Sequence, residues 1–128
     1  MPADNNIFSI KRRFKSVGYA IAGLVAMVKT QHNAWIHLFA TITVITVGFI
    51  VGVTAAQWCF LIIAIISVWA AEAINTAFEA LCDVASPDYH PQVKRAKDIA
   101  AGAVLLTAMG AAVIGCVILG PYLLQYFN

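Results

Sequence analysis

The sequence contains few charged side chains. Among its 128 residues, Lys and Arg together number 8 and Asp and Glu number 6, so 11% of the chain is charged, whereas soluble domains carry about 25%. Apolar side chains make up 62% of the chain, and the mean hydropathy is +0.84. A soluble protein of this size has too little interior to bury so much apolar surface. The composition excludes an ordinary soluble domain and predicts an integral membrane protein.

Net charge and cysteine are also scarce, and each scarcity excludes a class of protein. The formal net charge is only +2, and the sequence has no Lys- and Arg-rich segment interleaved with aromatics, so nucleic acid is not an expected partner. The 3 cysteines stand singly in apolar stretches, without the spacing of metal ligands. An odd number placed in this way is typical of reduced packing residues rather than of a disulfide framework.

Long apolar segments are abundant. Three of them each reach the roughly 20 residues needed to cross about 30 Å of hydrocarbon: 34–54, 57–81 and 99–124. A short polar break follows the first segment, and the turn-forming run Ser86-Pro87-Asp88 follows the second. The chain has no internal repeat and no low-complexity linker, so residues 1–128 are expected to form a single domain of helices.

The segment 7–29 differs from the three apolar segments. Its apolar side chains recur at spacings of three and four, and Lys11, Arg12 and Lys15 lie on another face, which predicts an amphipathic helix. A basic helix that is not apolar all round tends to lie in the membrane interface. The alternative is a signal segment, which is disfavoured because glycine and tyrosine interrupt the apolar run.

The positions of the basic residues predict the orientation of the chain. Every Lys and Arg lies either before the first apolar segment or between the second and third. Because cytoplasmic loops carry the excess of Lys and Arg, the N-terminus and the 82–98 loop are expected in the cytoplasm. Nearly all acidic residues lie near that side too, so we expect the chemistry to face the compartment that holds ATP.

Four polar residues share one face at the end of the second segment. At about 100° per residue, Glu72, Asn75, Glu79 and Asp83 fall within a stripe about 80° wide. Glu72 and Glu79 are separated by roughly 10 Å along the axis, so Glu72 is expected within the apolar layer and Glu79 near its surface. Ionisable groups at membrane depth cost several kcal/mol and are functional candidates. The alternative is a polar staple, in which Glu72 hydrogen-bonds to a neighbouring helix.

A catalytic interpretation assigns different tasks along this stripe. A positioned carboxylate can act as general base, and Glu79 at the interface can hold Mg²⁺, which usually takes one or two carboxylates plus substrate phosphates.

Two interpretations of Lys94, Arg95 and Lys97 remain open. These cations either face anionic headgroups, or Lys97 binds phosphate while Asp98 accepts hydrogen bonds from a sugar or amine. Lys94 and Asp98, four apart on one helix, can also form an ordinary pair.

These residues resemble the prokaryotic diacylglycerol kinase family, which includes the undecaprenol kinases. The segment from Glu72 to Asp83 is similar to the family signature E-x-x-N-[ST]-A-x-E-x-x-x-D. The resemblance covers roughly residues 12–120, and the ordered set of motifs is highly specific. The other matching motifs are Gly18-Tyr19, Gly23-Leu24, Asp88-Tyr89-His90 and Arg95-Ala96-Lys97-Asp98.

The resemblance implies a homotrimeric helical bundle in the bacterial inner membrane, with a surface helix and three transmembrane helices per chain. Its active sites would be shared between neighbouring chains at the cytoplasmic face, with ATP as co-substrate and Mg²⁺ as cofactor. It implies that Glu72 is the catalytic base, that Asn75 lies beside it, and that Glu79 binds Mg²⁺. The implied nucleotide-binding residues are Arg12, Tyr19, Gln31, Glu79, Asp88, Tyr89, His90, Lys97 and Asp98. We assign to the lipid substrate Lys15, Asn33, Trp35, His37 and Glu72.

One position departs from the family pattern. The family usually has Glu where this chain has Gln31, and that Glu is a second metal ligand. A Gln carbonyl oxygen can still coordinate Mg²⁺ but brings no charge. The substitution predicts weaker Mg²⁺ binding and a higher magnesium requirement.

The implied reaction is transfer of the ATP γ-phosphoryl group to the hydroxyl of diacylglycerol, giving phosphatidic acid. Undecaprenol is the alternative lipid, because several residues look more like the undecaprenol kinase branch: Asn33, Ile36, His37, Pro87 and Pro91. A second alternative is an inactive membrane binding or scaffold protein that kept the fold and lost catalysis, with Gln31 as the first substitution of a functional residue. A third is a proton-coupled transporter using Glu72, which is disfavoured because the charged groups lie on one side of the membrane.

Overall fold

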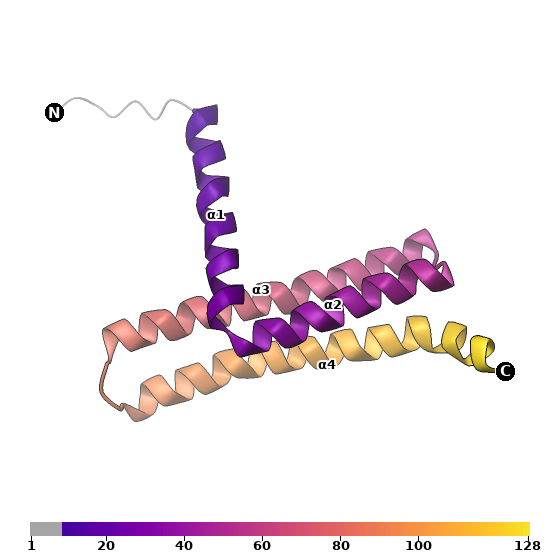
Figure 1. Ribbon diagram of the computed structural model, residues 1–128. Helices are drawn as coiled ribbons and strands as arrows, with labels where there is room; N and C mark the ends of the chain where they lie inside the picture. The colour runs from indigo at the N-terminus through magenta and orange to yellow at the C-terminus, as the bar shows by residue number, and fades with distance from the viewer. Residues whose placement is uncertain (1–8) are drawn as a thin grey trace.

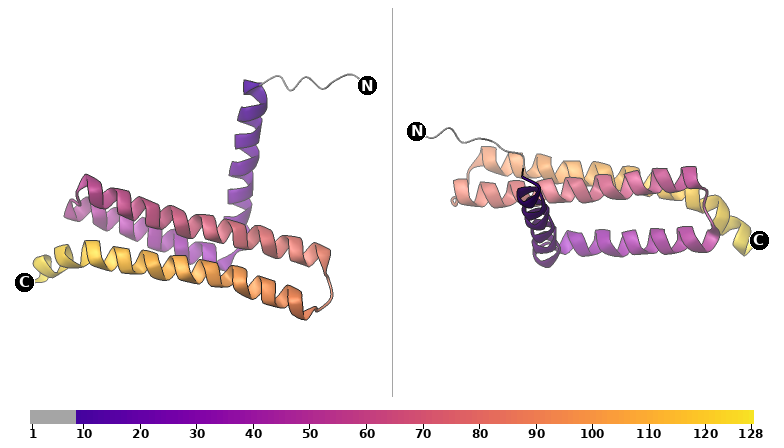
Figure 2. Two further views of the ribbon diagram at one scale, coloured as in Figure 1. Left: turned by 180° about the vertical axis from the view of Figure 1, so that it is seen from behind. Right: turned by 90° about the horizontal axis from the view of Figure 1, so that it is seen from above.

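The computed structural model describes residues 9–128, which fold into four α-helices. Three of them lie side by side as an elongated bundle, and α1 points away from that bundle (Figures 1 and 2). The helices α2, α3 and α4 are long and apolar enough to cross a membrane. The expectation of an all-helical chain, with an N-terminal helix followed by three long apolar helices, is confirmed. The helices are α1 (Ile10–Thr30), α2 (His32–Val51), α3 (Ala55–Ala85) and α4 (Pro91–Phe127).

The helix boundaries differ from the expected apolar segments. The helix expected over 57–81 continues to Ala85, and the one expected over 99–124 already begins at Pro91. Helical hydrogen bonding continues through polar turns until a residue interrupts it, and here Pro87 and Pro91 bracket the interruption. The helix expected over 34–54 begins earlier, at His32, and ends at Val51. The amphipathic helix expected over 7–29 begins at Ile10, while residues 7 and 8 lie outside the described residues.

The turn between α2 and α3 is fixed by local sequence. Gly52 has a positive φ of 71°, which ends α2 in the left-handed region that glycine adopts without steric cost. Thr54 then caps α3: its hydroxyl accepts from the backbone N–H of Gln57, whose side chain accepts from the backbone N–H of Thr54. The same Gln57 oxygen accepts a 2.8 Å hydrogen bond from the Tyr122 hydroxyl. This end of the bundle is therefore joined across α3 and α4.

Close packing aligns α2 with α3. A Cβ at Gly48 would lie 2.7 Å from the Trp58 ring, so only glycine lets the two helices approach here. Further along, the Trp69 indole N–H donates a 3.0 Å hydrogen bond to the Thr41 hydroxyl. Large apolar side chains such as Phe39 remain exposed on the bundle surface, as expected of helices that face lipid or other helices.

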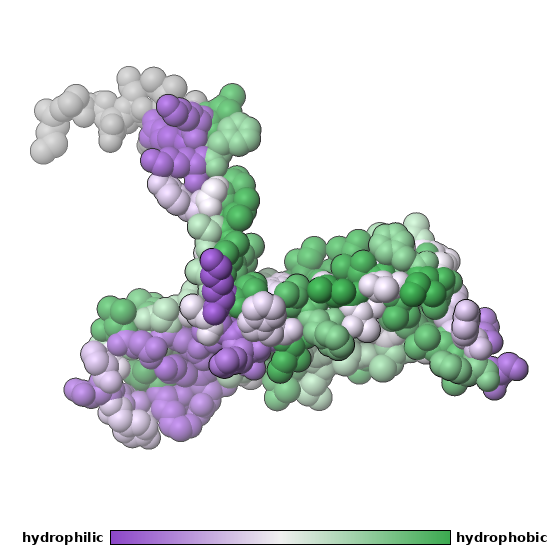
Figure 3. Space-filling view, in the orientation of Figure 1, coloured by the Kyte–Doolittle hydropathy of each residue, from purple (hydrophilic) through white to green (hydrophobic). Residues whose placement is uncertain are grey.

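The two longest helices exceed one membrane crossing. At about 1.5 Å per residue, α3 spans about 46 Å and α4 about 55 Å, compared with about 30 Å of hydrocarbon. Figure 3 shows a hydrophilic surface at the end of the bundle where these helices are joined. We call residues 79–98 the polar extension. In the same view, the hydrophilic face of α1 is turned toward the polar extension and its apolar face toward the apolar part of the bundle.

Candidate active site

A polar cavity of about 200 Å³ lies between α2, α3 and α4. Its polar side chains come from the beginning of α2 and the middle of α3, whereas α4 contributes only apolar ones. The structure thus brings together four residues that the sequence analysis placed in the catalytic or lipid-binding groups. The residues lining this polar cavity are Asn33, Ile36, His37, Glu72, Asn75, Ala101, Val104, Leu105 and Ala108.

Two of these polar side chains are almost completely buried. Glu72 is 1% exposed and Asn75 is 6% exposed. Within the described residues, neither carboxylate oxygen of Glu72 has a hydrogen-bond partner, and neither does Oδ1 of Asn75 or Nε2 of His37. Buried polar atoms are normally hydrogen-bonded, and a polar staple would satisfy Glu72 in this way. In the described residues, the Glu72 carboxylate has no hydrogen-bond partner, and His37 Nε2 lies 3.7 Å from its Oε2.

Burial decreases along the acidic stripe of α3. Glu72 and Asn75 are buried, Glu79 is half-buried and Asp83 is exposed. The predicted difference in depth between Glu72 and Glu79 is consistent with this gradient. The stripe therefore leads from the polar cavity to the polar extension along one helix.

Charged side chains of the polar extension contact one another. Nζ of Lys97 lies 2.8 Å from Oδ1 of Asp83 across the α3–α4 hairpin. Lys94 and Asp98 form the expected pair four residues apart on α4. Lys97 and Asp98, both expected to contact nucleotide, thus have protein partners in the nucleotide-free chain. These side chains are largely exposed, so the pairs contribute little to stability.

The turn between α3 and α4 contains three more of the residues that were expected to bind nucleotide. Asp88, Tyr89 and His90 are all exposed. His90 also caps α4, because its Nδ1 accepts a hydrogen bond from the backbone N–H of Gln92. Its side chain therefore has a structural partner in the nucleotide-free chain.

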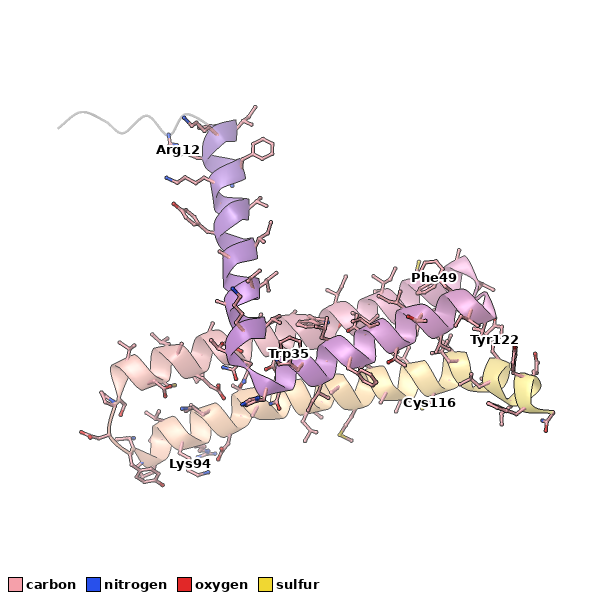
Figure 4. The ribbon with its side chains drawn as sticks, viewed as in Figure 1. Arg12, Trp35, Phe49, Lys94, Cys116 and Tyr122 are labelled. Carbon is pink, nitrogen blue, oxygen red and sulfur yellow. The ribbon has the colours of Figure 1, made fainter. Side chains whose placement is uncertain are left out.

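The expected residues of α1 lie apart from the polar extension. Figure 4 shows Arg12 near the outer end of α1 and Lys94 at the opposite side of the molecule. Tyr19 is exposed, and the Lys15 ammonium lies 5.9 Å from the centre of its ring. A single chain therefore does not bring Arg12 to the expected nucleotide residues of the polar extension.

The junction of α1 and α2 contains the remaining expected residues. Gln31 links the two helices in an extended conformation and is half-buried, with its backbone N–H bonded to Met27. Trp35 is exposed beside this junction (Figure 4). Within residues 9–128, no group of three or more His, Cys, Asp and Glu side chains is arranged to hold a metal ion.

An apolar groove adjoins the polar cavity. Its volume is about 580 Å³, and it runs between α2 and α4 over α3. Ile36, His37 and Ala108 line both spaces. The combined space has a polar end with an unpartnered carboxylate and a long hydrocarbon-lined end.

Sequence reasoning did not include Asp83 or Thr76 among the site residues. Asp83 belongs to the recognised stripe, so its place on the helix was available, but its contact with Lys97 depends on how α3 and α4 are rotated. Within residues 9–128, the Thr76 hydroxyl is buried and has no hydrogen-bond partner. Thr76 occupies the [ST] position of the family signature, so the sequence did offer a signal for it.

Comparison with known proteins identifies the family of this four-helix membrane protein. Residues 18–119 match the family model for prokaryotic diacylglycerol kinase. The chain therefore belongs to the prokaryotic diacylglycerol kinase family, and it is an ATP-dependent lipid kinase.

Three relatives illustrate the range of the family. The chain is 34% identical to an undecaprenol kinase of Bacillus subtilis over 89% of its own length and 93% of the relative. It is 39% identical to a diacylglycerol kinase of Synechocystis over 84% of its length, which spans only 63% of that relative. It is 30% identical to the diacylglycerol kinase of Escherichia coli over 90% of its length and 94% of the relative.

Proposed function

We propose that this protein transfers the γ-phosphoryl group of ATP to the hydroxyl of diacylglycerol, giving phosphatidic acid. The observation that carries this proposal is the buried Glu72, whose two unpartnered oxygens lie in a polar cavity beside an apolar groove. A lipid alcohol matches both ends of this space. Two relatives named diacylglycerol kinase, from distant bacteria, support the choice of lipid.

The residues of the chain divide the work of the transfer. Glu72 accepts the proton of the lipid hydroxyl, so that the oxygen can attack phosphorus, and Asn75 orients the group beside it. Lys97 leaves Asp83 and contacts the phosphates as a point charge. Phosphoryl transfer depends mainly on positioning and charge neutralisation, which agrees with a site whose charges lie at the boundary of the cavity.

The oxygen donors at this end of the chain fit Mg²⁺. Glu79 offers a carboxylate and Gln31 an amide oxygen, and Mg²⁺ is commonly held by one or two protein groups plus substrate phosphates. When bound, Mg²⁺ would neutralise phosphate charge.

The orientation and assembly of the chain also belong to this proposal. We place the N-terminus and the polar extension in the cytoplasm of a bacterium, because the Lys and Arg residues lie on that side. A homotrimer with shared sites would explain why α1, which carries Arg12 and Tyr19, points away from the bundle of its own chain (Figure 1). A neighbouring copy would supply them.

Undecaprenol is the second candidate substrate. The relative from Bacillus subtilis bears that name and aligns over 93% of its length. Its hydroxyl would occupy the same cavity and its longer chain the same groove.

A direct assay tests the proposed function and separates the two lipids. Purified protein in mixed micelles is given labelled ATP, magnesium and either diacylglycerol or undecaprenol. We expect labelled phosphatidic acid to form at the higher kcat/KM. Faster labelling of undecaprenol would show that undecaprenol, not diacylglycerol, is the preferred substrate. Labelling of neither lipid at any magnesium concentration would favour the alternative of an inactive scaffold protein.

A further inference from the structure

His37 faces the candidate catalytic base inside the polar cavity. Its Nε2 lies 3.7 Å from Oε2 of Glu72, and its side chain is 15% exposed. Among the described residues, it is the one ionisable side chain within ion-pair distance of Glu72. The two side chains come from α2 and α3, so the contact depends on how these helices pack.

The surroundings make this contact important. An ionised carboxylate buried at membrane depth costs several kcal/mol unless another group balances its charge. From α4, the cavity receives only Ala101, Val104, Leu105 and Ala108, and from α3 the neutral Asn75. The nearest titratable groups of the α1–α2 junction, Lys29 and His32, are exposed and do not line the cavity. His37 is therefore the one side chain lining the cavity that can carry a positive charge.

The separation of the two side chains suits a contact that tightens when substrate binds. A distance of 3.7 Å is longer than a hydrogen bond but within ion-pair range. Catalytic hydrogen bonds are often long in ligand-free structures and shorten in the complex. Both atoms lack another partner in the described chain, so neither has to break a bond in order to move.

We propose that His37 is a positioning residue that acts as the counter-ion of Glu72. Its protonated imidazole holds Oε2 and balances the carboxylate charge, so that Oε1 remains free to accept the proton of the lipid hydroxyl. This assignment rests on the proposed function, because it concerns the base of the same reaction. It differs from the lipid contact assigned to His37 from the sequence.

The proton balance is simple. As the lipid oxygen forms its bond to the γ-phosphorus, the bond from that phosphorus to the bridging oxygen of ADP breaks. The hydroxyl proton passes to Glu72, and ADP leaves with the electron pair of the broken bond. His37 keeps its own proton throughout and then faces a neutral carboxyl group, which favours return of the transferred proton to water.

Kinetics of His37 variants test the positioning role. In His37→Leu, we expect kcat to fall on the order of 10²-fold, because removing one partner leaves an uncompensated buried charge on Glu72, with little change in the KM for MgATP. His37→Gln, which keeps a hydrogen-bond donor without the charge, should lose less. His32→Gln is the matched control, because His32 is an exposed histidine of the same helix outside the cavity, and it should keep wild-type kcat.

Infrared spectroscopy of the protonated carboxyl band gives a readout that is independent of turnover. At neutral pH we expect this band to appear in His37→Leu, to be absent from wild type, and to vanish in His37→Leu/Glu72→Gln. Unchanged kcat in both His37 variants, or no carboxyl band in either, would overturn the proposal. If His37→Leu fails to fold, the kinetic and infrared measurements are both made on His37→Gln. Failure of the wild-type protein to phosphorylate any lipid would refute the proposed function instead. The infrared comparison would still show whether His37 and Glu72 form an ion pair.

Discussion

The polar cavity and the polar extension contain the same kinds of side chain in opposite states. In the cavity, Glu72 is 1% exposed and its carboxylate oxygens have no hydrogen-bond partner in the described chain. In the extension, Asp83 contacts Lys97 and Asp98 contacts Lys94, and all four side chains are wholly or partly exposed to solvent. The cavity contains an unsatisfied acid, whereas the extension contains acids that already have partners.

This difference indicates where binding energy is available. A buried, unpartnered carboxylate is costly in the free protein, and a hydroxyl that satisfies it gains a hydrogen bond in a low-dielectric setting. An exposed ion pair is weak because water screens it. Nucleotide phosphates can therefore replace Asp83 at Lys97 at little cost. We expect substitutions in the cavity to affect turnover most, and substitutions in the extension to affect MgATP affinity.

The largest effect should come from Glu72→Gln, which keeps the shape of the side chain but removes the base. We expect kcat to fall by roughly 10²- to 10⁴-fold, the range typical of a lost general base. MgATP binding, measured by equilibrium titration of the folded protein, should be close to wild type. Substantial turnover in this variant would remove Glu72 from its role.

The next largest effect should come from Lys97→Met, which removes a charge that we assign to the phosphates. We expect the KM for MgATP to rise roughly 10- to 100-fold, as for loss of a hydrogen bond to a charged group. Lys94→Gln is the matched control, since Lys94 lies one turn away and pairs with Asp98. Equal KM changes in the two variants would show that the general charge of the extension matters and that Lys97 has no specific contact.

A smaller effect is expected from Gln31→Glu. An added carboxylate near a bound cation contributes about 1 kcal/mol in a solvated site, so the magnesium concentration for half-maximal activity should fall roughly fivefold. Magnesium titration at fixed ATP measures this value. Gln92→Glu adds the same charge on an exposed position of α4 and should leave the titration unchanged. An unchanged titration in Gln31→Glu would place residue 31 away from the metal.

The smallest effect is expected from Asp83→Asn. Because the pair with Lys97 is largely exposed, the free energy of unfolding should change little. Release of Lys97 should lower the KM for MgATP by about two- to threefold, consistent with a weak surface pair. A raised KM would show that Asp83 itself contacts nucleotide or metal.

The sequence predicts some of these features and cannot predict others. The lengths of the apolar segments and the positions of Pro87 and Pro91 were sufficient to predict three long helices and the turn between α3 and α4. The polar stripe through Asp83 and the spacing of Lys94 and Asp98 already indicated helix beyond the apolar segments, and the structure gives the exact boundaries at Ala85 and Pro91. The periodicity of α3 placed Glu72 and Glu79 on one face, whereas the burial of Glu72 between helices is a finding of the structure.

Contacts between helices could not be read from the sequence. The approach of His37 to Glu72 and of Lys97 to Asp83 depends on the rotation of each helix about its axis, which periodicity within one helix does not fix. Gly48 illustrates the same limit, since its need for glycine arises from Trp58 on the next helix. The sequence thus supplied the candidate groups, and packing determined their pairs.

The central claim is that the polar extension meets ATP at the cytoplasmic face, next to the polar cavity. The most direct measurement uses a variant in which Cys59, Cys82 and Cys116 are replaced and one cysteine is placed at Pro87 or at Ala55. In sealed inverted membrane vesicles, we predict that a membrane-impermeant thiol reagent labels the cysteine at 87 and not the one at 55, and that MgATP slows labelling at 87. Labelling at 55 only, or labelling at 87 that MgATP does not affect, would contradict the account.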